Sequence, residues 1–309
     1  MHLAEMGDGP LVLLCHGFPE CWYSWRHQLK ALAQAGFHVV APDQRGYGQT
    51  DRPAEIRAYS IFQLVGDMVG LVQELGYTSA VIVGHDWGAP VAWYSGLLRP
   101  DLFTAVGLLS VPYIPRPSAR PSELMRALAG DKVFYQEYFQ EPGRAESELE
   151  ADLEKSLLAI FYSASGEASP KERWRYLFDR DEPLSRTLSV PDKLPQWLSE
   201  EDLKFFAAEF RRTGFSGGLN WYRNIDFNWE LTPFLNGAKI LQPALFIAGD
   251  KDPVVEFYRD AYQKLEHFVP KLQGKFLLPG AGHWIQQERP DKVNQLLLDF
   301  LNRLGHLSS

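Results

Sequence analysis

One short segment in the first third of the chain has the residue types of a nucleophile held on a strained turn. Residues 84–88 read Gly-His-Asp-Trp-Gly and lie where an apolar run at 80–84 passes into a stretch of helical character at 87–98. Small residues at both ends permit the sharp strand-to-helix turn that raises the central side chain above a sheet. The pattern predicts that Asp86 is a nucleophile, with aspartate where serine usually stands. The alternative is a surface aspartate that caps the following helix.

Two later turns supply an acid and a base. Residues 249–254 read Gly-Asp-Lys-Asp-Pro-Val directly after one apolar run, and residues 280–284 read Gly-Ala-Gly-His-Trp directly after another. The chain order of nucleophile, acid and histidine is the order that α/β-hydrolases use. We therefore predict that His283 is the base and that Asp252 or the competing acid, Asp250, orients it.

Short apolar runs alternate with amphipathic stretches on both sides of these turns. The apolar runs predict strands and the amphipathic stretches predict helices. The expected strands are 11–15, 38–41, 80–84, 106–110, 244–248 and 275–278, and the expected helices are 24–35, 60–75, 87–98, 256–267 and 290–304. Their alternation predicts an α/β fold with a mostly parallel sheet and helices on both faces.

The middle of the chain has a different character. Four prolines within ten residues, 112–121, indicate a stiff linker, and residues 122–230 contain no run typical of a buried strand. One helix there is well marked, because Ser199 can cap it and Asp202 follows three residues later. We therefore predict an α/β core, residues 1–112 and 233–309, interrupted by a helical cap at 113–232. Insertions of this kind usually cover an active site.

The composition narrows the classes of function. Of 309 residues, 45% are hydrophobic and 23% are charged, which is typical of a globular protein with a full core. A net charge of −8 does not indicate the positively charged surface with which proteins bind nucleic acid. No apolar run reaches the ~18 residues of a membrane span, and we see no secretory signal at the start. The two cysteines, Cys15 and Cys21, make no disulfide framework, so a reduced, cytoplasmic setting is expected.

Several motifs resemble those of the soluble epoxide hydrolases, the group that includes the C-terminal domain of the mammalian enzyme and its bacterial relatives. The resemblance covers nearly the whole chain. Its motifs are His-Gly-Phe-Pro-Glu at 16–20, Trp-Tyr-Ser-Trp-Arg at 22–26, Gly-Tyr-Gly at 46–48, Tyr-Phe-Gln-Glu-Pro-Gly at 138–143 and Asn-Trp-Tyr-Arg-Asn at 220–224. The resemblance implies an α/β-hydrolase fold and favours Asp252 over Asp250 as the acid.

The resemblance also implies a reaction. Asp86 would attack an epoxide and form an ester, which water activated by His283 would hydrolyse to a vicinal diol. A serine would form an ether instead, which water does not cleave under mild conditions. A carboxylate is therefore the suitable nucleophile at the turn of residues 84–88. The substrate would be a small apolar epoxide with water as the second reactant, and no metal or organic cofactor is required. An oligomeric assembly is compatible with everything in the sequence.

Further roles follow from the same resemblance. Tyr135 and Tyr222 would hold the epoxide oxygen and donate to the alkoxide that ring opening creates, whereas Tyr138, Tyr162 and Tyr176 would only pack. The backbone N–H groups of two residues would form the oxyanion hole, and four side chains would contact substrate. The oxyanion-hole residues are Phe18 and Trp87, and the substrate-contacting residues are Phe18, Trp87, Trp221 and Trp284.

The chain departs from the family pattern in two places. The family has a strand before the segment at 2–7, and this strand looks missing here, so one edge of the sheet is expected to be short. Ala89 and Pro90 follow the elbow, where two small residues are common, and Ala89 still allows close packing of helix on strand.

Four other functions fit the sequence less well. A haloalkane dehalogenase usually has asparagine where this chain has Phe18, and it has no reason to present a pair of tyrosines. A fluoroacetate dehalogenase would need arginine where Trp87 stands, and Asp86 itself excludes a serine esterase. A small-molecule receptor of the same fold would not need an intact set of nucleophile, base and acid.

Overall fold

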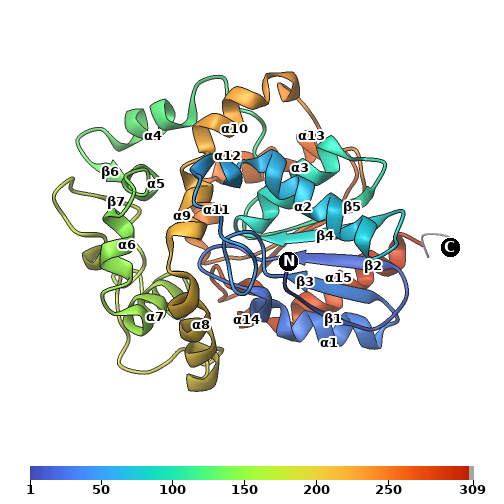
Figure 1. Cartoon of the computed structure of the whole chain (residues 1–309), viewed down its shortest axis with the longest axis horizontal. Coiled ribbons are helices and arrows are strands. Elements are labelled where there is room, and N and C mark those ends of the chain that lie inside the picture. Colours follow the sequence, from blue (N-terminus) through green and yellow to red (C-terminus); the bar gives the residue numbers. More distant parts are fainter. Residues whose placement is uncertain (306–309) are drawn as a thin grey trace.

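A seven-stranded sheet forms the centre of the molecule in the computed structural model, which describes residues 1–305 (Figure 1). Its strands in spatial order are β1 (Leu3–Met6), β3 (His38–Pro42), β2 (Leu11–Cys15), β4 (Ala80–His85), β5 (Phe103–Leu109), β8 (Ala244–Gly249) and β9 (Leu272–Leu278). Only the edge strand β1 runs antiparallel to its neighbour, and all other pairs are parallel. The mostly parallel sheet of an α/β-hydrolase fold is therefore confirmed.

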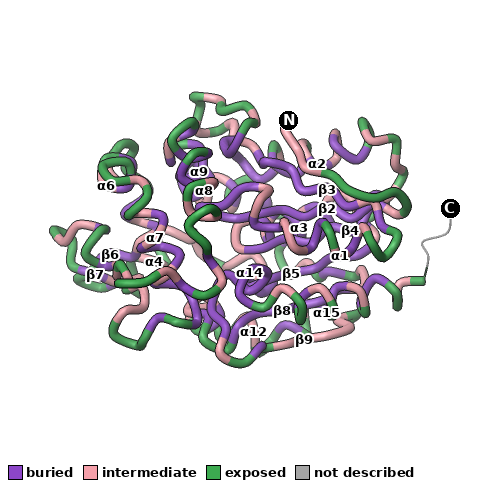
Figure 2. Tube along the Cα trace, turned by 90° about the horizontal axis from the view of Figure 1, so that it is seen from below, coloured by how far each residue is buried: buried purple, intermediate pink, exposed green. Residues whose placement is uncertain are grey.

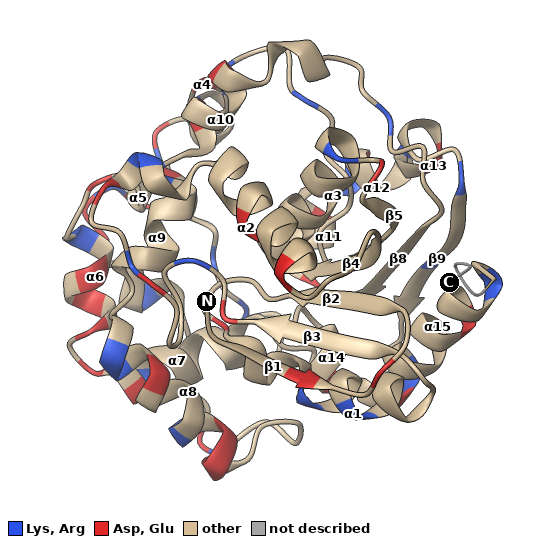
Figure 3. Ribbon diagram, turned by 45° about the vertical axis from the view of Figure 1, so that its right-hand side comes forward, with Lys and Arg blue, Asp and Glu red and all other residues tan. Residues whose placement is uncertain are grey.

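Helices cover both faces of the sheet because alternate strand residues point to opposite sides. Val81 and Val83 pack into the core beneath α1 (Arg26–Gln34) and α15 (Pro290–Arg303), whereas Ile82 packs into the core beneath α2 (Ile61–Glu74) and α3 (Gly88–Leu98). The central strands β2, β4 and β8 are buried along their whole length (Figure 2). They also carry no Lys, Arg, Asp or Glu, so the charges gather on the outer helices and loops (Figure 3).

A group of helices lies at one end of the sheet, between β5 and β8 in the chain (Figure 1). They are α4 (Pro121–Ala129), α5 (Tyr135–Tyr138), α6 (Arg144–Leu149), α7 (Leu153–Ser163), α8 (Glu200–Thr213), α9 (Ser216–Tyr222) and α10 (Ile225–Leu231). The helix expected after Ser199 is confirmed as α8, because the Ser199 side chain accepts a hydrogen bond from the N–H of Asp202 at its start. The exact division of the chain at 112 and 232 stays a prediction.

Two expectations about secondary structure are wrong. The insertion contains two short antiparallel strands, β6 (Val133–Phe134) and β7 (Leu177–Phe178), which are too short to leave a pattern in the sequence. The helix expected at 256–267 is three short helices, α11 (Pro253–Phe257), α12 (Arg259–Gln263) and α13 (Leu265–Phe268). The backbone leaves helical geometry at the two junctions between them, where ψ reaches 30° and 8°.

The segment at the start of the chain forms the sheet edge. Strand β1 pairs with β3 from Leu3 opposite Pro42 to Met6 opposite Val39. Within residues 1–305, none of the helices has the length and apolar character needed to cross a membrane.

Candidate active site

The turn between β4 and α3 holds Asp86 in a strained conformation. Its φ of 49° lies in the left-handed region, which an aspartate adopts only when the surrounding structure enforces it. Close backbone contacts supply this enforcement. A Cβ atom at Gly84 would collide with the carbonyl group of Gly88, and one at Gly88 would collide with the carbonyl group of Cys15. The turn therefore has the geometry of a nucleophile elbow.

Three side chains from separate turns meet at this elbow. His283 Nε2 lies 3.3 Å from Asp86 Oδ2, and His283 Nδ1 lies 3.2 and 3.3 Å from the two oxygens of Asp252. Asp252 also caps α11, because its Oδ1 accepts from the N–H of Val254 at 2.9 Å. The competing acid points elsewhere, since Asp250 is exposed and accepts from the N–H of Gly280. The structure thus brings together Asp86, His283 and Asp252.

Opposing forces act on the pKa of His283. Burial lowers the pKa of the imidazole, but the carboxylates of Asp252 and Asp86 outweigh it and raise the pKa well above its ordinary value. Loss of the charge on Asp86 would remove part of this shift and leave the imidazole more easily deprotonated. The electrostatics therefore link the basicity of His283 to the chemical state of Asp86.

The backbone next to the elbow supports one oxygen of Asp86. The N–H of Phe18 donates to Asp86 Oδ1 at 2.8 Å. Residues 18 and 19 belong to the loop after β2, and Trp87 follows Asp86 directly at the start of α3. A donor beside one carboxylate oxygen is the arrangement that an oxyanion hole requires. The oxyanion-hole roles of Phe18 and Trp87 stay predictions.

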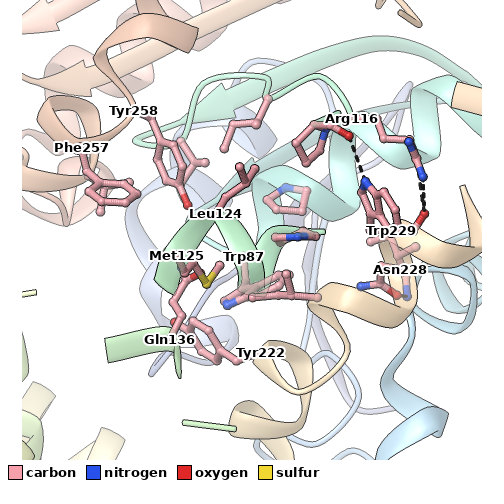
Figure 4. Close-up of a pocket in the computed structure, with 18 of the residues that line it drawn as sticks. Trp87, Arg116, Leu124, Met125, Gln136, Tyr222, Asn228, Trp229, Phe257 and Tyr258 are labelled. Carbon is pink, nitrogen blue, oxygen red and sulfur yellow. Dashed lines mark hydrogen bonds between the residues drawn. The ribbon is translucent and has the colours of Figure 1, made fainter. Parts of the chain in front are cut away.

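A cavity of about 320 Å³ opens beside Asp86 (Figure 4). Most of its wall is apolar or aromatic, as is typical of a site for an apolar ligand. Of the predicted site residues, Asp86, Trp87, Tyr135 and Tyr222 line it, together with Ile61, Pro90, Trp93, Tyr94, Val111, Ile114, Arg116, Pro117, Pro121, Leu124, Met125, Leu128, Gln136, Ile225, Asn228, Trp229, Thr232, Val254, Phe257 and Tyr258.

Two tyrosines from different helices approach the cavity together. Tyr135 begins α5 and Tyr222 ends α9, and their ring centres lie 6.1 Å apart. The ring of Tyr222 also stands edge-on to that of Trp87, with centres 5.1 Å apart. Burial raises the pKa of both phenols well above its ordinary value, and the charge of Asp86 adds to the shift. Both hydroxyls are therefore protonated near neutral pH and available as donors.

Two of the tryptophans predicted to contact substrate do not line this cavity, and their contact with substrate stays a prediction. Trp221 and Trp284 are buried and do not line it. The indole N–H of Trp221 donates to the carbonyl of Arg45, and that of Trp284 donates to the carbonyl of Phe161. Both rings thus pack inside the protein, Trp221 against Trp87 and Trp284 against His283. The ring of Phe18 is likewise absent from the lining, because it packs against Tyr222 and neighbouring phenylalanines.

A buried polar network beneath the elbow was not predicted from the sequence. His85 Nδ1 lies 2.7 Å from Glu20 Oε2, and its Nε2 lies 2.7 Å from the backbone carbonyl oxygen of His283. Ser110 Oγ donates to the same carbonyl at 2.7 Å. Burial raises the pKa of Glu20, but the charge of His85 and hydrogen bonds with His85, the Gly17 N–H and Ser24 outweigh it and bring the pKa to about 2. This network fixes the backbone of His283.

Removal of one partner of this network should cost stability. We expect Glu20→Ala to lower the free energy of unfolding by about 3–5 kcal/mol, because it leaves a buried polar partner uncompensated. Chemical denaturation followed by circular dichroism measures this loss. Glu5→Ala, which removes an exposed partner of His38, is the matched control and should cost less than about 1 kcal/mol. Equal effects of the two substitutions would contradict the prediction.

Comparisons with known proteins agree with this geometry. The model of the alpha/beta hydrolase fold family matches residues 10–290. The chain is 46% identical over 306 residues to epoxide hydrolase A of Mycobacterium tuberculosis, covering 98% of this chain and 94% of that protein. The structure of an epoxide hydrolase from an endophytic Streptomyces matches with a TM-score of 0.96 and 48% identity, covering 98% of this chain and 92% of that one. That of epoxide hydrolase A from Mycobacterium thermoresistibile matches with a TM-score of 0.92 and 49% identity, covering 97% and 94%.

A strained aspartate elbow backed by a histidine and a second carboxylate, on a mostly parallel sheet, defines a hydrolase of the α/β class. The chain belongs to the alpha/beta hydrolase fold family and, within it, to the epoxide hydrolases.

Proposed function

We propose that the protein converts epoxides and water to vicinal diols through a covalent ester on Asp86. The observation that carries this proposal is the position of Asp86 and two phenols on one apolar cavity, with His283 and Asp252 behind the carboxylate. Epoxide hydrolysis is also what the names of the similar proteins state.

In the first step, a carboxylate oxygen of Asp86 attacks an epoxide carbon and the carbon–oxygen bond of the ring breaks. Because Oδ1 is held by the Phe18 N–H, we assign the attack to Oδ2. The opened oxygen is an alkoxide, a strong base, and it takes a proton from a phenol of Tyr135 or Tyr222. Preorganised donors of this kind stabilise the charge that develops on the oxygen.

In the second step, His283 takes a proton from water, and the hydroxide attacks the carbonyl carbon of the ester. The oxyanion forms on Oδ1, beside the Phe18 N–H. Its collapse breaks the bond between the carbonyl carbon and Oδ2 and expels the diol, whose new hydroxyl takes its proton from the imidazolium of His283. The remaining proton of the attacking water passes to the tyrosinate left by the first step, which restores the phenol and leaves Asp86 as a carboxylate. Asp252 stabilises the imidazolium that exists between these events.

A dehalogenase is the nearest rival function. It would also form an ester on Asp86, but its leaving group is a halide ion, which needs no proton. Two protonated phenols on the cavity favour an alkoxide leaving group, so the epoxide reaction suits the site better.

A single turnover in water labelled with heavy oxygen tests the mechanism. With enzyme in excess over styrene oxide, we expect the label in the Asp86 carboxylate and not in the diol, because the diol takes its new oxygen from Asp86. Mass spectrometry of the peptide that contains residues 84–88 measures this. Label in the diol of the first turnover would mean that water attacks the epoxide directly, and the ester mechanism would be wrong.

A further inference from the structure

One buried carboxylate close to the base has no part in the proposed reaction. Glu288 ends the short helix α14 (Ile285–Glu288), which follows His283 in the chain, and its side chain is buried. Helix α14 lies between α7 of the insertion and the strands of the sheet (Figure 1, Figure 2). Glu288 is therefore placed where the inserted helices meet the turn that carries the base.

The carboxylate of Glu288 accepts three hydrogen bonds from backbone N–H groups. Its Oε2 accepts from Gly282 and from Gly166, each at 2.9 Å, and its Oε1 accepts from Trp284 at 3.2 Å. Gly282 and Trp284 flank His283 in the chain, whereas Gly166 belongs to the insertion and follows α7. One side chain thus ties both neighbours of the base to the insertion.

The turn of residues 282–284 also touches the insertion through its backbone. The N–H of His283 donates to the carbonyl of Ala164 at 2.9 Å. A Cβ atom at Gly282 would lie 2.3 Å from the nitrogen of Gly166, and one at Gly166 would lie 2.3 Å from the carbonyl oxygen of Gly280. Because no side chain fits between the two segments, the position of this turn depends on its contact with the insertion.

Glu288 holds parts of the turn that the network of His85 does not reach. His85 and Ser110 bind the carbonyl oxygen of His283 from the side of the sheet. Glu288 instead binds the N–H groups on either side of His283. The two sets of bonds together fix the backbone from which the imidazole extends toward Asp86.

An ionised carboxylate is the group that this place requires. It offers acceptor sites on both oxygens and has no proton of its own to oppose an N–H group. Glutamine has nearly the same shape, but its NH2 group would face one of the three N–H groups. Burial raises the pKa of Glu288 to about 6, and the charge of Asp252 adds to this rise while the three N–H groups oppose it. Glu288 is therefore mostly ionised at neutral pH.

We propose that Glu288 is a positioning residue for hydrolysis of the Asp86 ester, because it holds the turn of residues 282–284 against the insertion and so keeps the imidazole of His283 at the ester. The proposal rests on the proposed function, since it assigns Glu288 to the second of its two steps. Ring opening uses no general base and should not depend on Glu288. A displacement of a reacting group by about 1 Å can slow a reaction by about 10²-fold, so hydrolysis should be sensitive to the loss of this support.

The substitution Glu288→Gln tests this role with styrene oxide as the substrate. Ester hydrolysis should slow by about 10-fold to 100-fold, because the imidazole is no longer held in place. Ester formation should stay within about twofold of the wild-type rate, and KM should fall together with kcat because the ester accumulates. Rapid-quench experiments with intact-protein mass spectrometry measure the formation and the decay of the ester separately.

Two further variants complete the test. Glu288→Asp keeps the charge but is too short to serve all three donors, so it should also slow hydrolysis and leave ester formation unchanged. It carries the same test if Glu288→Gln does not fold. The matched control is Glu150→Gln, since Glu150 accepts from the N–H of Phe215 at 2.8 Å, outside the turn of residues 282–284. This control should form and hydrolyse the ester at the wild-type rates.

Three results would overturn this inference while leaving the proposed function intact. One is a folded Glu288→Gln protein that hydrolyses the ester at the wild-type rate. Another is a parallel loss of ester formation and ester hydrolysis, since Glu288 would then support the whole site. The third is the failure of both Glu288 variants to fold, because the carboxylate would then serve the fold and not one step. If the wild type formed no ester on Asp86, the proposed function would be wrong and this inference would fall with it.

Discussion

Replacement of His283 by glutamine is expected to stop turnover at the covalent ester, with a loss of about 10³-fold in steady-state rate. Ring opening needs no general base, because Asp86 attacks as a carboxylate. Ester hydrolysis does need one, because neutral water is a poor nucleophile toward an ester. The variant should therefore react with one equivalent of epoxide and then accumulate as protein plus one substrate. Intact-protein mass spectrometry with styrene oxide measures the adduct, and a burst assay measures its amount.

Two controls make this result specific. His267→Gln changes an exposed histidine on α13, and it should turn over at the wild-type rate. Asp252→Asn should slow the second step, because it leaves His283 without its stabilising charge. A His283→Gln protein that shows neither burst nor adduct with a substrate of the wild type would refute the division into two steps.

The same two steps explain how His283 can be a base despite its raised pKa. In the resting enzyme, burial lowers the pKa of the imidazole, but the carboxylates of Asp252 and Asp86 raise it well above the ordinary value. An ester on Asp86 carries no charge, so one of these carboxylates no longer acts in the intermediate. The pKa of His283 then falls, and the neutral base is available when water must be activated.

The ion pair of His283 with Asp252 stabilises the fold fully below the ordinary pKa of histidine, and that stabilisation is lost as the pH rises through the raised pKa.

Sequence motifs predicted the reacting groups because each lies in a turn of restricted geometry. Asp86 lies between glycines that no larger residue can replace without a clash, and His283 and Asp252 each follow a strand of the same parallel sheet. The ends of such strands lie at one edge, so residues far apart in the chain meet there. Tyr135 and Tyr222, which face the same cavity, were accessible only through the resemblance, because tyrosines in a cap usually pack.

The same motifs do not predict the direction in which a side chain points. Trp221 lies beside Tyr222 in the chain, yet one ring packs inward and the other lines the cavity, because neighbouring helical residues point to different sides. The pairing of Glu20 with His85 joins segments 65 residues apart, which no local pattern predicts.

The double substitution Tyr135→Phe and Tyr222→Phe is expected to slow ring opening by at least about 10³-fold, with each single change costing about 10-fold to 10²-fold. The alkoxide is a poor leaving group without a donor. In either single variant the remaining phenol still donates, so the double loss should exceed the product of the single losses. The rate of ester formation in a single turnover measures this step, because steady-state rates also contain ester hydrolysis.

The matched control is Tyr162→Phe, which removes a cap phenol that donates to Glu172 at the surface and does not line the cavity. This variant should open epoxides at the wild-type rate.

The acid–base character of Tyr135 and Tyr222 gives a second readout. Burial raises the pKa of both phenols well above its ordinary value, so ring opening should persist into alkaline solution where an exposed tyrosine would already be ionised. A double phenylalanine variant that formed the ester at close to the wild-type rate would leave the alkoxide without its donors, and a leaving group that needs no proton, such as halide, would then suit the site better.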